Sequence, residues 1–342
     1  MVVFVHLPFE ERKVFAYPAL LPLERVGTLG VDLFFVISGF IMVATTWNQF
    51  GRPGAPRDFL IRRVLRIYPL WMIGVAATVA TASLLPGVRR VDGGLTPAHA
   101  LLSFFLIPHG RDPVILFGWS LSYELIFYMV FALALATVRR RLWLVLAAWS
   151  AFVLVCCAAA TAGAGGPVVA YLGNPLSLEF VAGAAAGYAY RSGALRYAGP
   201  ALALGVVWFA GAALASTHVG AIRDADPLLL ARVLAAGPAA VFVVFGAAAV
   251  EARDGLVAPR PLVVLGDASY SMYLFNGYLM ALVALVARRA HLAGPLAHAA
   301  FVVTGLAVVA FGALAIFRFV EAPLIAALRG YGRTPGAARA AA

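Results

Sequence analysis

Long apolar runs alternate with short polar or basic loops along almost the whole chain. An apolar run of about 20 residues has the length of a helix that crosses a bilayer. The spacing predicts nine full spans, at about 29–48, 67–85, 115–138, 142–160, 170–190, 198–216, 233–250, 268–287 and 299–317. Together with a shorter first segment, these runs predict an all-α, polytopic membrane bundle of about ten transmembrane helices, the first of them truncated.

The first apolar segment, Met1–Pro8, is too short to cross a membrane. Eight helical residues rise about 12 Å, whereas the hydrocarbon core of a bilayer is about 30 Å thick. We therefore expect this segment to be the outer end of a helix whose beginning is missing. Pro8, Glu10 and Glu11 predict that the helix ends there and that a polar loop begins.

The composition supports a membrane protein and argues against a nucleic-acid-binding protein. The chain is 63% hydrophobic and 12% charged, with a mean hydropathy of +0.93. Its net charge of +11 comes from arginines that cluster between apolar runs, as membrane topology produces. The two cysteines, Cys156 and Cys157, are adjacent in an apolar run and indicate neither a disulfide framework nor a metal site. We expect one membrane domain over 1–322 and a disordered cytoplasmic tail over 323–342.

The distribution of basic residues predicts the orientation in the membrane. With the N-terminus inside, the inner loops and tail hold 16 of the 26 Lys and Arg residues and the outer loops hold 10. This bias places both termini in the cytoplasm. The longest outer loop, 86–114, contains the apolar stretch Ala98–Pro108, which is too short to span. That stretch is expected either to lie in the membrane interface or to dip into the protein.

Four ionisable residues fall at membrane depth: His6, Asp32, Glu124 and Glu179. Such residues are costly in hydrocarbon and usually face a cavity or a partner. In the predicted orientation, the first three converge in one outer layer, where a carboxylate would orient the histidine as a general base. The alternative is that His6 is an interfacial residue, Asp32 caps its helix, and Glu124 is bonded to a neighbouring helix. Glu179 lies beside small residues and is read as structural.

Three arginines, Arg62, Arg63 and Arg66, mark the inner start of one span. Guanidinium groups bind phosphate oxygens through paired hydrogen bonds, so these residues are candidates for binding a cytosolic phosphate-bearing donor. Tyr68 is expected to pack beside that donor. The alternative, which composition alone favours, is that the arginines only set the topology.

Two further stretches are rich in aromatic and hydroxyl groups. One runs from Trp119 to Tyr128 and the other from Gly266 to Asn276. The hydroxyl groups of the second stretch either line a polar channel or bridge helices. The candidate substrate-binding residues in these stretches are Trp119, Tyr123, Ser269, Tyr270 and Asn276. The sequence has no Walker loop, dinucleotide fingerprint, metal-ligand spacing or nucleophile elbow, which argues against an ATP-driven pump and a metallohydrolase.

Together these stretches resemble membrane acyltransferase family 3. The resemblance is carried, in order, by Gly30-Val-Asp-Leu-Phe-Phe-Val-Ile-Ser-Gly-Phe, Arg62-Arg-Val-Leu-Arg-Ile-Tyr-Pro, Trp119-Ser-Leu-Ser-Tyr-Glu-Leu-Ile-Phe-Tyr, Gly266-Asp-Ala-Ser-Tyr-Ser-Met-Tyr-Leu and Val320-Glu-Ala-Pro. Gly51-Arg-Pro-Gly-Ala-Pro also looks like the branch that modifies exopolysaccharides and O-antigens. His6 fits the histidine of the family's first helix, whereas the arginine that precedes this histidine by ten intervening residues would fall ahead of Met1. Two other departures are Asn276, where the family often has histidine, and Ala322, where it usually has arginine.

The resemblance implies transfer of an acyl group, usually acetyl from acetyl-CoA, to a hydroxyl of a sugar or lipid-linked glycan at the bacterial inner membrane. We expect the arginines to bind acyl-CoA, no metal to be needed, His6 to act as base, and Asp32 or Glu124 to assist it. A covalent acyl-histidine step stays open. The rival functions are a transporter or flippase for a lipid-linked sugar, whose path the same residues would line, and a sensor or scaffold subunit of an export complex.

Overall fold

The computed structural model describes residues 3–15, 23–84, 94–215 and 227–331. Within these ranges the regular structure is entirely helical, and nine helical segments are long and apolar enough to cross a membrane. This confirms the predicted all-α membrane bundle. The spans lie close to the predicted ranges because the length of each apolar run sets the length of its helix.

The long helices differ in length and two of the spans are interrupted. The helices that cross as single elements are α2 (Leu23–Thr46), α3 (Ala55–Leu84), α5 (Gly118–Leu135), α6 (Leu142–Thr161), α9 (Ala198–Ala215), α10 (Pro227–Asp254) and α12 (Ser269–Arg289). One span is broken into α7 (Gly166–Leu172) and α8 (Ser177–Arg191). Another joins α13 (Pro295–Ile316) to α14 (Ala322–Tyr331) through a π-helical turn, Phe317–Glu321.

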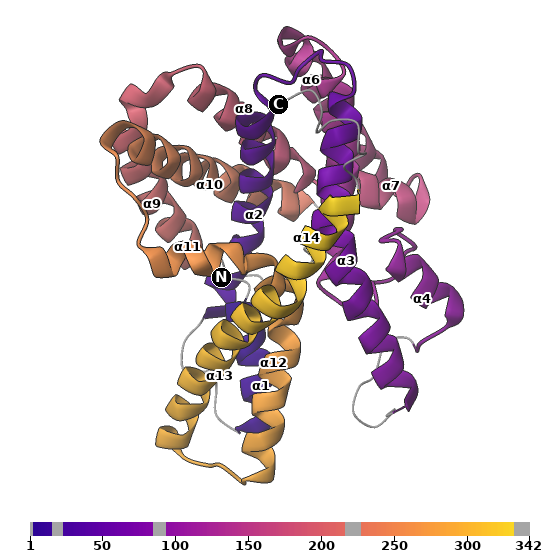
Figure 1. Cartoon of the computed structure of the whole chain (residues 1–342), viewed down its shortest axis with the longest axis vertical. Coiled ribbons are helices and arrows are strands. Elements are labelled where there is room, and N and C mark those ends of the chain that lie inside the picture. Colours follow the sequence, from indigo (N-terminus) through magenta and orange to yellow (C-terminus); the bar gives the residue numbers. More distant parts are fainter. Residues whose placement is uncertain (1–2, 16–22, 85–93, 216–226, 332–342) are drawn as a thin grey trace.

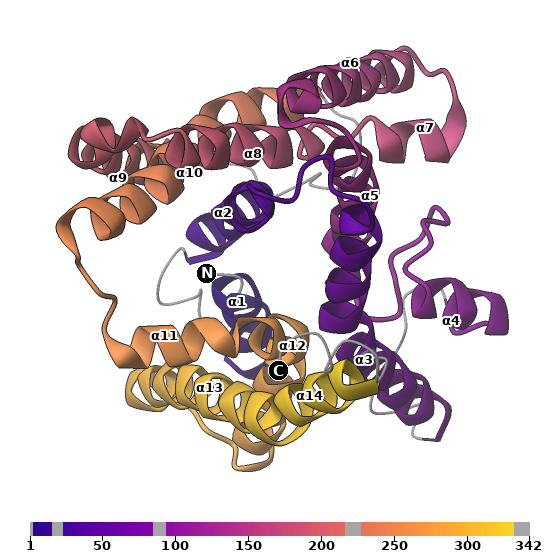
Figure 2. The same ribbon diagram turned by 45° about the horizontal axis from the view of Figure 1, so that its top comes forward.

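Figure 2 shows how the helices surround α2 and the short helix α1 (Val3–Val14). Helices α6, α8, α9 and α10 form one side, and the short helix α11 (Arg260–Asp267) with α13 and α14 forms the opposite side (Figures 1 and 2). Helices α3 and α5 lie between these two sides. Helix α2 can approach α8 closely because a Cβ atom on Gly183 would lie only 2.0 Å from the backbone oxygen of Val36.

Helix α1 does not end where the sequence predicted. It continues through Pro8 to Val14, and Glu11 is buried with 2% of its surface exposed. The buried imidazole of His298, at the start of α13, pairs with the Glu11 carboxylate. This partner allows the acidic residue to lie inside the protein instead of in the expected polar loop.

The short helix α4 (Pro97–Phe104) settles the two possibilities for the apolar stretch in loop 86–114. The indole Nε1 of Trp71 donates to the Ser103 backbone oxygen at 3.0 Å, and the Tyr68 hydroxyl donates to the Phe105 oxygen at 3.0 Å. Trp71 lies 13 residues before the C-terminal end of α3, which corresponds to about 20 Å along the helix axis. The C-terminal end of α4 therefore dips into the protein.

The chain after residue 322 begins as a helix. Helix α14 runs from Ala322 to Tyr331, so the first part of the expected disordered tail is helical. The rest of that predicted tail, 332–342, lies outside the described residues.

Candidate functional site

Glu124, on α5, is the centre of a buried polar cluster. Its Oε1 accepts a hydrogen bond from Ser38 Oγ of α2 at 3.0 Å and another from the Tyr128 hydroxyl at 2.5 Å. Only 6% of Glu124 is exposed. Both donors are neutral, so the carboxylate is solvated within the bundle without a direct ion pair.

Two of the three predicted arginines lie near this carboxylate. Arg63 and Arg66 are three residues apart on α3, share one helix face and interact electrostatically with Glu124. The Arg63 guanidinium also lies 5.4 Å from the centre of the Tyr128 ring. Arg62 points elsewhere and donates to Gln49 Oε1 at 3.1 Å. Arg62 and Arg66 are exposed and Arg63 is partly buried, so the predicted cluster of three divides by its partners: Arg63 and Arg66 act on Glu124, and Arg62 binds Gln49.

A second carboxylate, Glu321, lies on the other side of Arg66. The π-helical turn places Glu321 so that Ser271 Oγ of α12 donates to its Oε2 at 2.6 Å. Arg66 interacts electrostatically with both Glu321 and Glu124. π-helical turns are frequent at functional sites. Ser38 and Ser271 were not predicted as site residues, because a serine inside an apolar run carries no distinctive signal.

His6 lies in a separate layer, against the first residue before α5. Its ring centre is 4.0 Å from that of Phe117, in an edge-on arrangement. The Phe117 backbone oxygen accepts a hydrogen bond from the Tyr273 hydroxyl, which also lies 2.7 Å from Ser120 Oγ. A neutral imidazole at this position is able to accept a proton.

The predicted contact of His6 with a carboxylate is not present in the described part of the chain. Asp32 and Glu124 each have their own partners on other helices. The expected orientation of His6 by one of these carboxylates is therefore not seen among the described residues. Phe117 and Glu124 are seven residues apart, so the His6 layer and the Glu124 cluster are separated by about 10 Å along the α5 axis.

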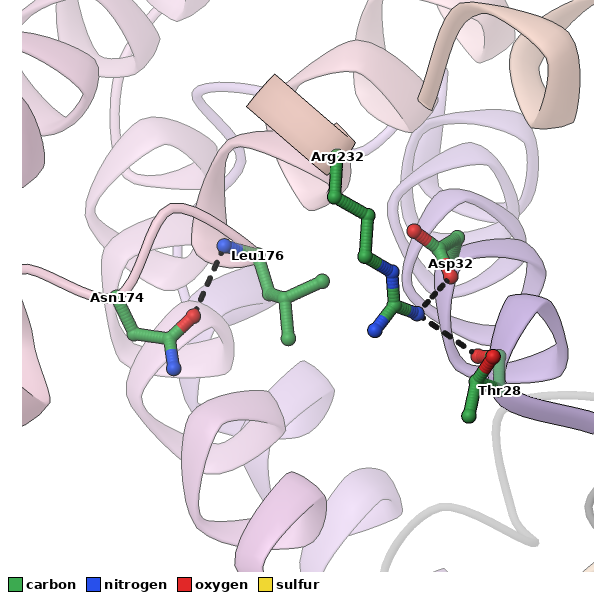
Figure 3. Close-up of polar contacts among 5 residues, drawn as sticks. All are labelled: Thr28, Asp32, Asn174, Leu176 and Arg232. Atoms are coloured by element: carbon green, nitrogen blue, oxygen red, sulfur yellow. Dashed lines mark hydrogen bonds and ion pairs between the residues drawn. The ribbon is translucent and has the colours of Figure 1, made fainter. Parts of the chain in front are cut away.

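Asp32 instead belongs to a charged cluster between α2, α8 and α10. Figure 3 shows Arg232 reaching from α10 to donate to Asp32 Oδ2 at 2.5 Å and to the Thr28 backbone oxygen at 3.0 Å. Glu179 of α8 interacts electrostatically with this pair. Sequence reasoning assigned Arg232 to an outer loop, but α10 begins at Pro227 and includes it.

A turn beside this cluster is shaped by an asparagine. Asn174 is buried in the connection between α7 and α8, and its Oδ1 accepts a hydrogen bond from the Leu176 backbone N–H at 3.0 Å (Figure 3). The bond satisfies a backbone donor that the break between the two helices leaves unpaired. Asn174 therefore fixes the start of α8, the helix that carries Glu179.

The remaining predicted residues lie either in the interior or at the surface. Tyr270 is buried and its hydroxyl donates to the Ile67 backbone oxygen at 2.8 Å, which links α12 to α3. Asn276 Oδ1 is buried without a hydrogen-bond partner among the described residues, one residue before a glycine that packs on the Phe117 ring. Ser269 is exposed at the start of α12.

Two aromatic candidates form part of the protein interior. Trp119 and Tyr123 lie one turn apart on α5, with ring centres 6.1 Å apart. Tyr123 stacks on Tyr171 at 4.2 Å. Tyr68, predicted to pack beside the donor, is directed toward the end of α4. Among the described residues, no group of three or more His, Cys, Asp and Glu side chains has the arrangement of a metal site.

Comparison with known proteins identifies the family to which this chain belongs. A family model described as an acyltransferase domain matches residues 1–318. The exopolysaccharide production protein ExoZ of Rhizobium meliloti is 32% identical over 325 residues, covering 93% of this chain and 95% of ExoZ. The acyltransferase MdmB of Streptomyces mycarofaciens is 30% identical over 287 residues, covering 75% of this chain and 69% of MdmB. No solved structure matches the chain. The chain therefore belongs to membrane acyltransferase family 3.

Proposed function

We propose that this membrane acyltransferase moves an acetyl group from cytosolic acetyl-CoA to a hydroxyl of an exopolysaccharide or of its lipid-linked precursor. The family supports acyl transfer, and the relative named for exopolysaccharide production supports a glycan acceptor. The protein would lie in the bacterial inner membrane with both termini in the cytoplasm, as the bias of basic residues favours.

The observation that carries the proposal is that the arginines lie near the polar groups of the interior. Arg63 and Arg66 interact electrostatically with the buried Glu124, and the His6 layer begins about 10 Å further along α5. The phosphates of the donor would bind the arginines, and its thin pantetheine arm would extend past Glu124 toward His6. Arg62, at the surface, would contribute to the first encounter with the negatively charged donor.

His6 would act as the general base in the transfer step. The acceptor oxygen forms a bond to the thioester carbonyl carbon while the hydroxyl proton passes to the neutral imidazole. The carbon–sulfur bond then breaks, and the imidazolium gives its proton to the CoA thiolate, so that CoA leaves as a thiol and His6 is neutral again. Glu124, hydrogen-bonded to Ser38 and Tyr128 on the path between the two layers, would assist proton transfer on the thiolate side. Asp32 would act indirectly, on the acceptor side of the site, by holding α2 in place. This helix also carries Ser38 of the Glu124 cluster.

Replacing His6 with alanine tests the proposal directly. His6→Ala should lower the rate of acyl transfer by about 10²–10⁴-fold, the usual contribution of a general base. The measurement is transfer of radiolabelled acetyl from acetyl-CoA to glycan in membranes that contain the purified protein. Binding of acetyl-CoA should be unchanged, because the arginines are intact. His291→Ala, at an exposed position between α12 and α13, is the matched control and should have full activity. Full activity of His6→Ala would exclude His6 as the base.

A further inference from the structure

A buried histidine–carboxylate pair that takes no part in the proposed reaction joins α1 to α13. The imidazole Nε2 of His298, at the start of α13, pairs with Oε1 of Glu11 on α1. The two residues are almost completely buried, with 3% and 2% of their surfaces exposed. Phe15, which follows α1, stacks on the His298 ring with the ring centres 4.6 Å apart. Because the pair is enclosed in this way, any influence that it has on the reaction must act through α1.

Helix α1 also carries His6, the base of the proposed reaction. Glu11 lies five residues after His6, which corresponds to about 7.5 Å along the helix axis. Pro8 lies between them and has no N–H to donate to the Phe4 backbone oxygen, so the turn that contains His6 lacks one bond of the helical ladder. A turn weakened in this way depends on contacts with neighbouring helices for a fixed position.

Helix α13 contacts α1 at two levels. A Cβ atom on Gly305 would lie 3.8 Å from Leu7 Cδ1, so α13 approaches α1 beside the residue that follows His6. His298, seven residues before Gly305, binds Glu11, four residues after Leu7 and on the same face of α1. The apolar contact at Leu7 would allow the helix to slide, whereas the pairing of Nε2 with Oε1 forms at only one axial position of α1.

The axial position of α1 determines where the His6 ring meets the rest of the site. That ring lies edge-on to Phe117, with the ring centres 4.0 Å apart. The Phe117 backbone oxygen is in turn bonded to the Tyr273 hydroxyl of α12, so this wall of the site is fixed independently of α1. A slide of α1 would therefore move the imidazole relative to the wall. A displacement of about 1 Å in a catalytic group can lower the rate by about 100-fold.

We propose that the His298–Glu11 pair positions His6 for the reaction. The pair sets how far α1 extends along α13, and it thereby holds the imidazole against Phe117 in the place where it takes the proton of the acceptor. The inference rests on the proposed function, because it concerns the base of that reaction. His298 and Glu11 are positioning residues and do not touch either substrate.

Two amides of different length at position 298 test the proposal. In His298→Gln the amide nitrogen replaces Nε2 and can still donate to Glu11, whereas in His298→Asn it is one methylene too short. We expect His298→Asn to lower kcat for acetyl transfer by about 10–100-fold, and His298→Gln to keep most of its kcat. KM for acetyl-CoA should be unchanged in both, because the arginines are intact. Equal kcat values in the two variants, or a change in KM alone, would overturn the proposal.

The position of the His6 ring can also be measured without catalysis. In the full-length protein with isotope-labelled histidine, the NMR signal of His6 is the one that disappears in His6→Ala, and the ring current of Phe117 displaces its chemical shift. We expect this displacement to be kept in His298→Gln and lost in His298→Asn. A His6 signal at the same position in both variants would overturn the proposal.

An exposed histidine in the turn before α13 provides the control. His291 has a left-handed backbone conformation, with a φ of 48°, which asparagine tolerates. His291→Asn should therefore change neither kcat nor the His6 signal. A pair that only stabilises the fold would lower the unfolding temperature of His298→Asn and leave its kcat and its His6 signal unchanged, and this result would contradict the positioning role.

The NMR signal distinguishes the failure of this proposal from the failure of the proposed function. If His6→Ala is fully active, His6 is not the base, yet a His6 signal that moves in His298→Asn and not in His298→Gln would still show that the pair sets the position of the ring. If His6→Ala is inactive and the signal does not move in His298→Asn, His6 keeps its role as base and the positioning role of the pair is wrong.

Discussion

Asp32 and Glu124 are both buried carboxylates at membrane depth, and both lie in clusters that include α2, but they are neutralised in different ways. Asp32 forms a direct ion pair with Arg232 of α10, at 2.5 Å. Glu124 accepts hydrogen bonds from the neutral Ser38 and Tyr128, and its arginines act without a direct ion pair. One carboxylate is thus tied to a fixed opposite charge, whereas the other is held by groups that can rearrange.

This difference indicates separate roles for the two clusters. A buried ion pair joins helices strongly, because removing either partner leaves an uncompensated charge in a medium of low dielectric. Hydroxyl donors can rotate toward a ligand or a migrating proton with little cost. We therefore expect the Asp32 cluster mainly to hold α2, α8 and α10 together, and the Glu124 cluster to take part in the reaction. The following predictions test this division, starting with the largest effect.

Replacing Asp32 should affect stability most. Asp32→Ala leaves the partly buried Arg232 without its carboxylate, and breaking a fully buried pair typically costs about 3–5 kcal/mol, so we expect a loss toward the lower end of that range. The change should appear as a large fall in the unfolding temperature of the detergent-solubilised protein. Asp254→Ala, which removes the carboxylate of an exposed pair with Arg253, is the control and should not shift that temperature measurably. An unfolding temperature unchanged by Asp32→Ala would contradict the structural role of the ion pair.

Replacing Glu124 should affect the reaction more than stability. Glu124→Gln keeps an oxygen that can accept from Ser38 and Tyr128, but it can no longer exchange a proton. We expect kcat for acyl transfer to fall about 100-fold or more, with little change in unfolding temperature. Glu251→Gln, at an exposed position on α10, should retain full kcat. If Glu124→Gln keeps its kcat but unfolds at a much lower temperature, the two carboxylates have the same structural role.

Removing a donor from Glu124 should have the smallest effect of the three. Ser38→Ala deletes one hydrogen bond and leaves that of Tyr128, so we expect a loss of about 1 kcal/mol in stability. The expected decrease in kcat is less than that of Glu124→Gln. Thr45→Ala on the same helix is the control, because its hydroxyl bonds only to the backbone of the preceding turn. A decrease in kcat as large as that of Glu124→Gln would show that Ser38 itself acts in the reaction.

The helical spans could be predicted because membrane length is a simple constraint. Each apolar run had to be about 20 residues long, and the ends of the helices followed from the charges that flank it. The extension of α1 could not be predicted, because it depends on a partner almost 300 positions away. Glu11 reads as a loop residue in the sequence, and only its contact with His298 explains why it is buried.

The candidate site was predictable in its residues and less so in its arrangement. Glu124, Arg63 and Arg66 stood out in the sequence because charged residues in membrane helices need partners. The sequence analysis placed Glu124 in an outer layer and the arginines at the inner start of a span, whereas in the structure Arg63 and Arg66 are near enough to Glu124 to interact with it. The pairing of Arg232 with Asp32 could not be predicted, because an arginine near the end of a helix resembles an arginine in a loop. The position of the His6 ring against Phe117, and not against a carboxylate, follows from the packing of α1 against α2 and α12, which no local pattern encodes.

Pro69 divides α3 into two segments that can tilt independently. Proline has no N–H to donate to Leu65, and its ring crowds that turn, so the helical ladder is interrupted between Arg66 and Trp71. The Tyr270 hydroxyl stabilises this turn by donating a hydrogen bond to the Ile67 backbone oxygen. In the proposed function, the end of α3 that carries the arginines would bend at Pro69 to admit the nucleotide of the donor, while the rest of the helix keeps its contacts with α4. Flexure of this kind would let one continuous helix serve two substrates that approach from opposite faces of the membrane.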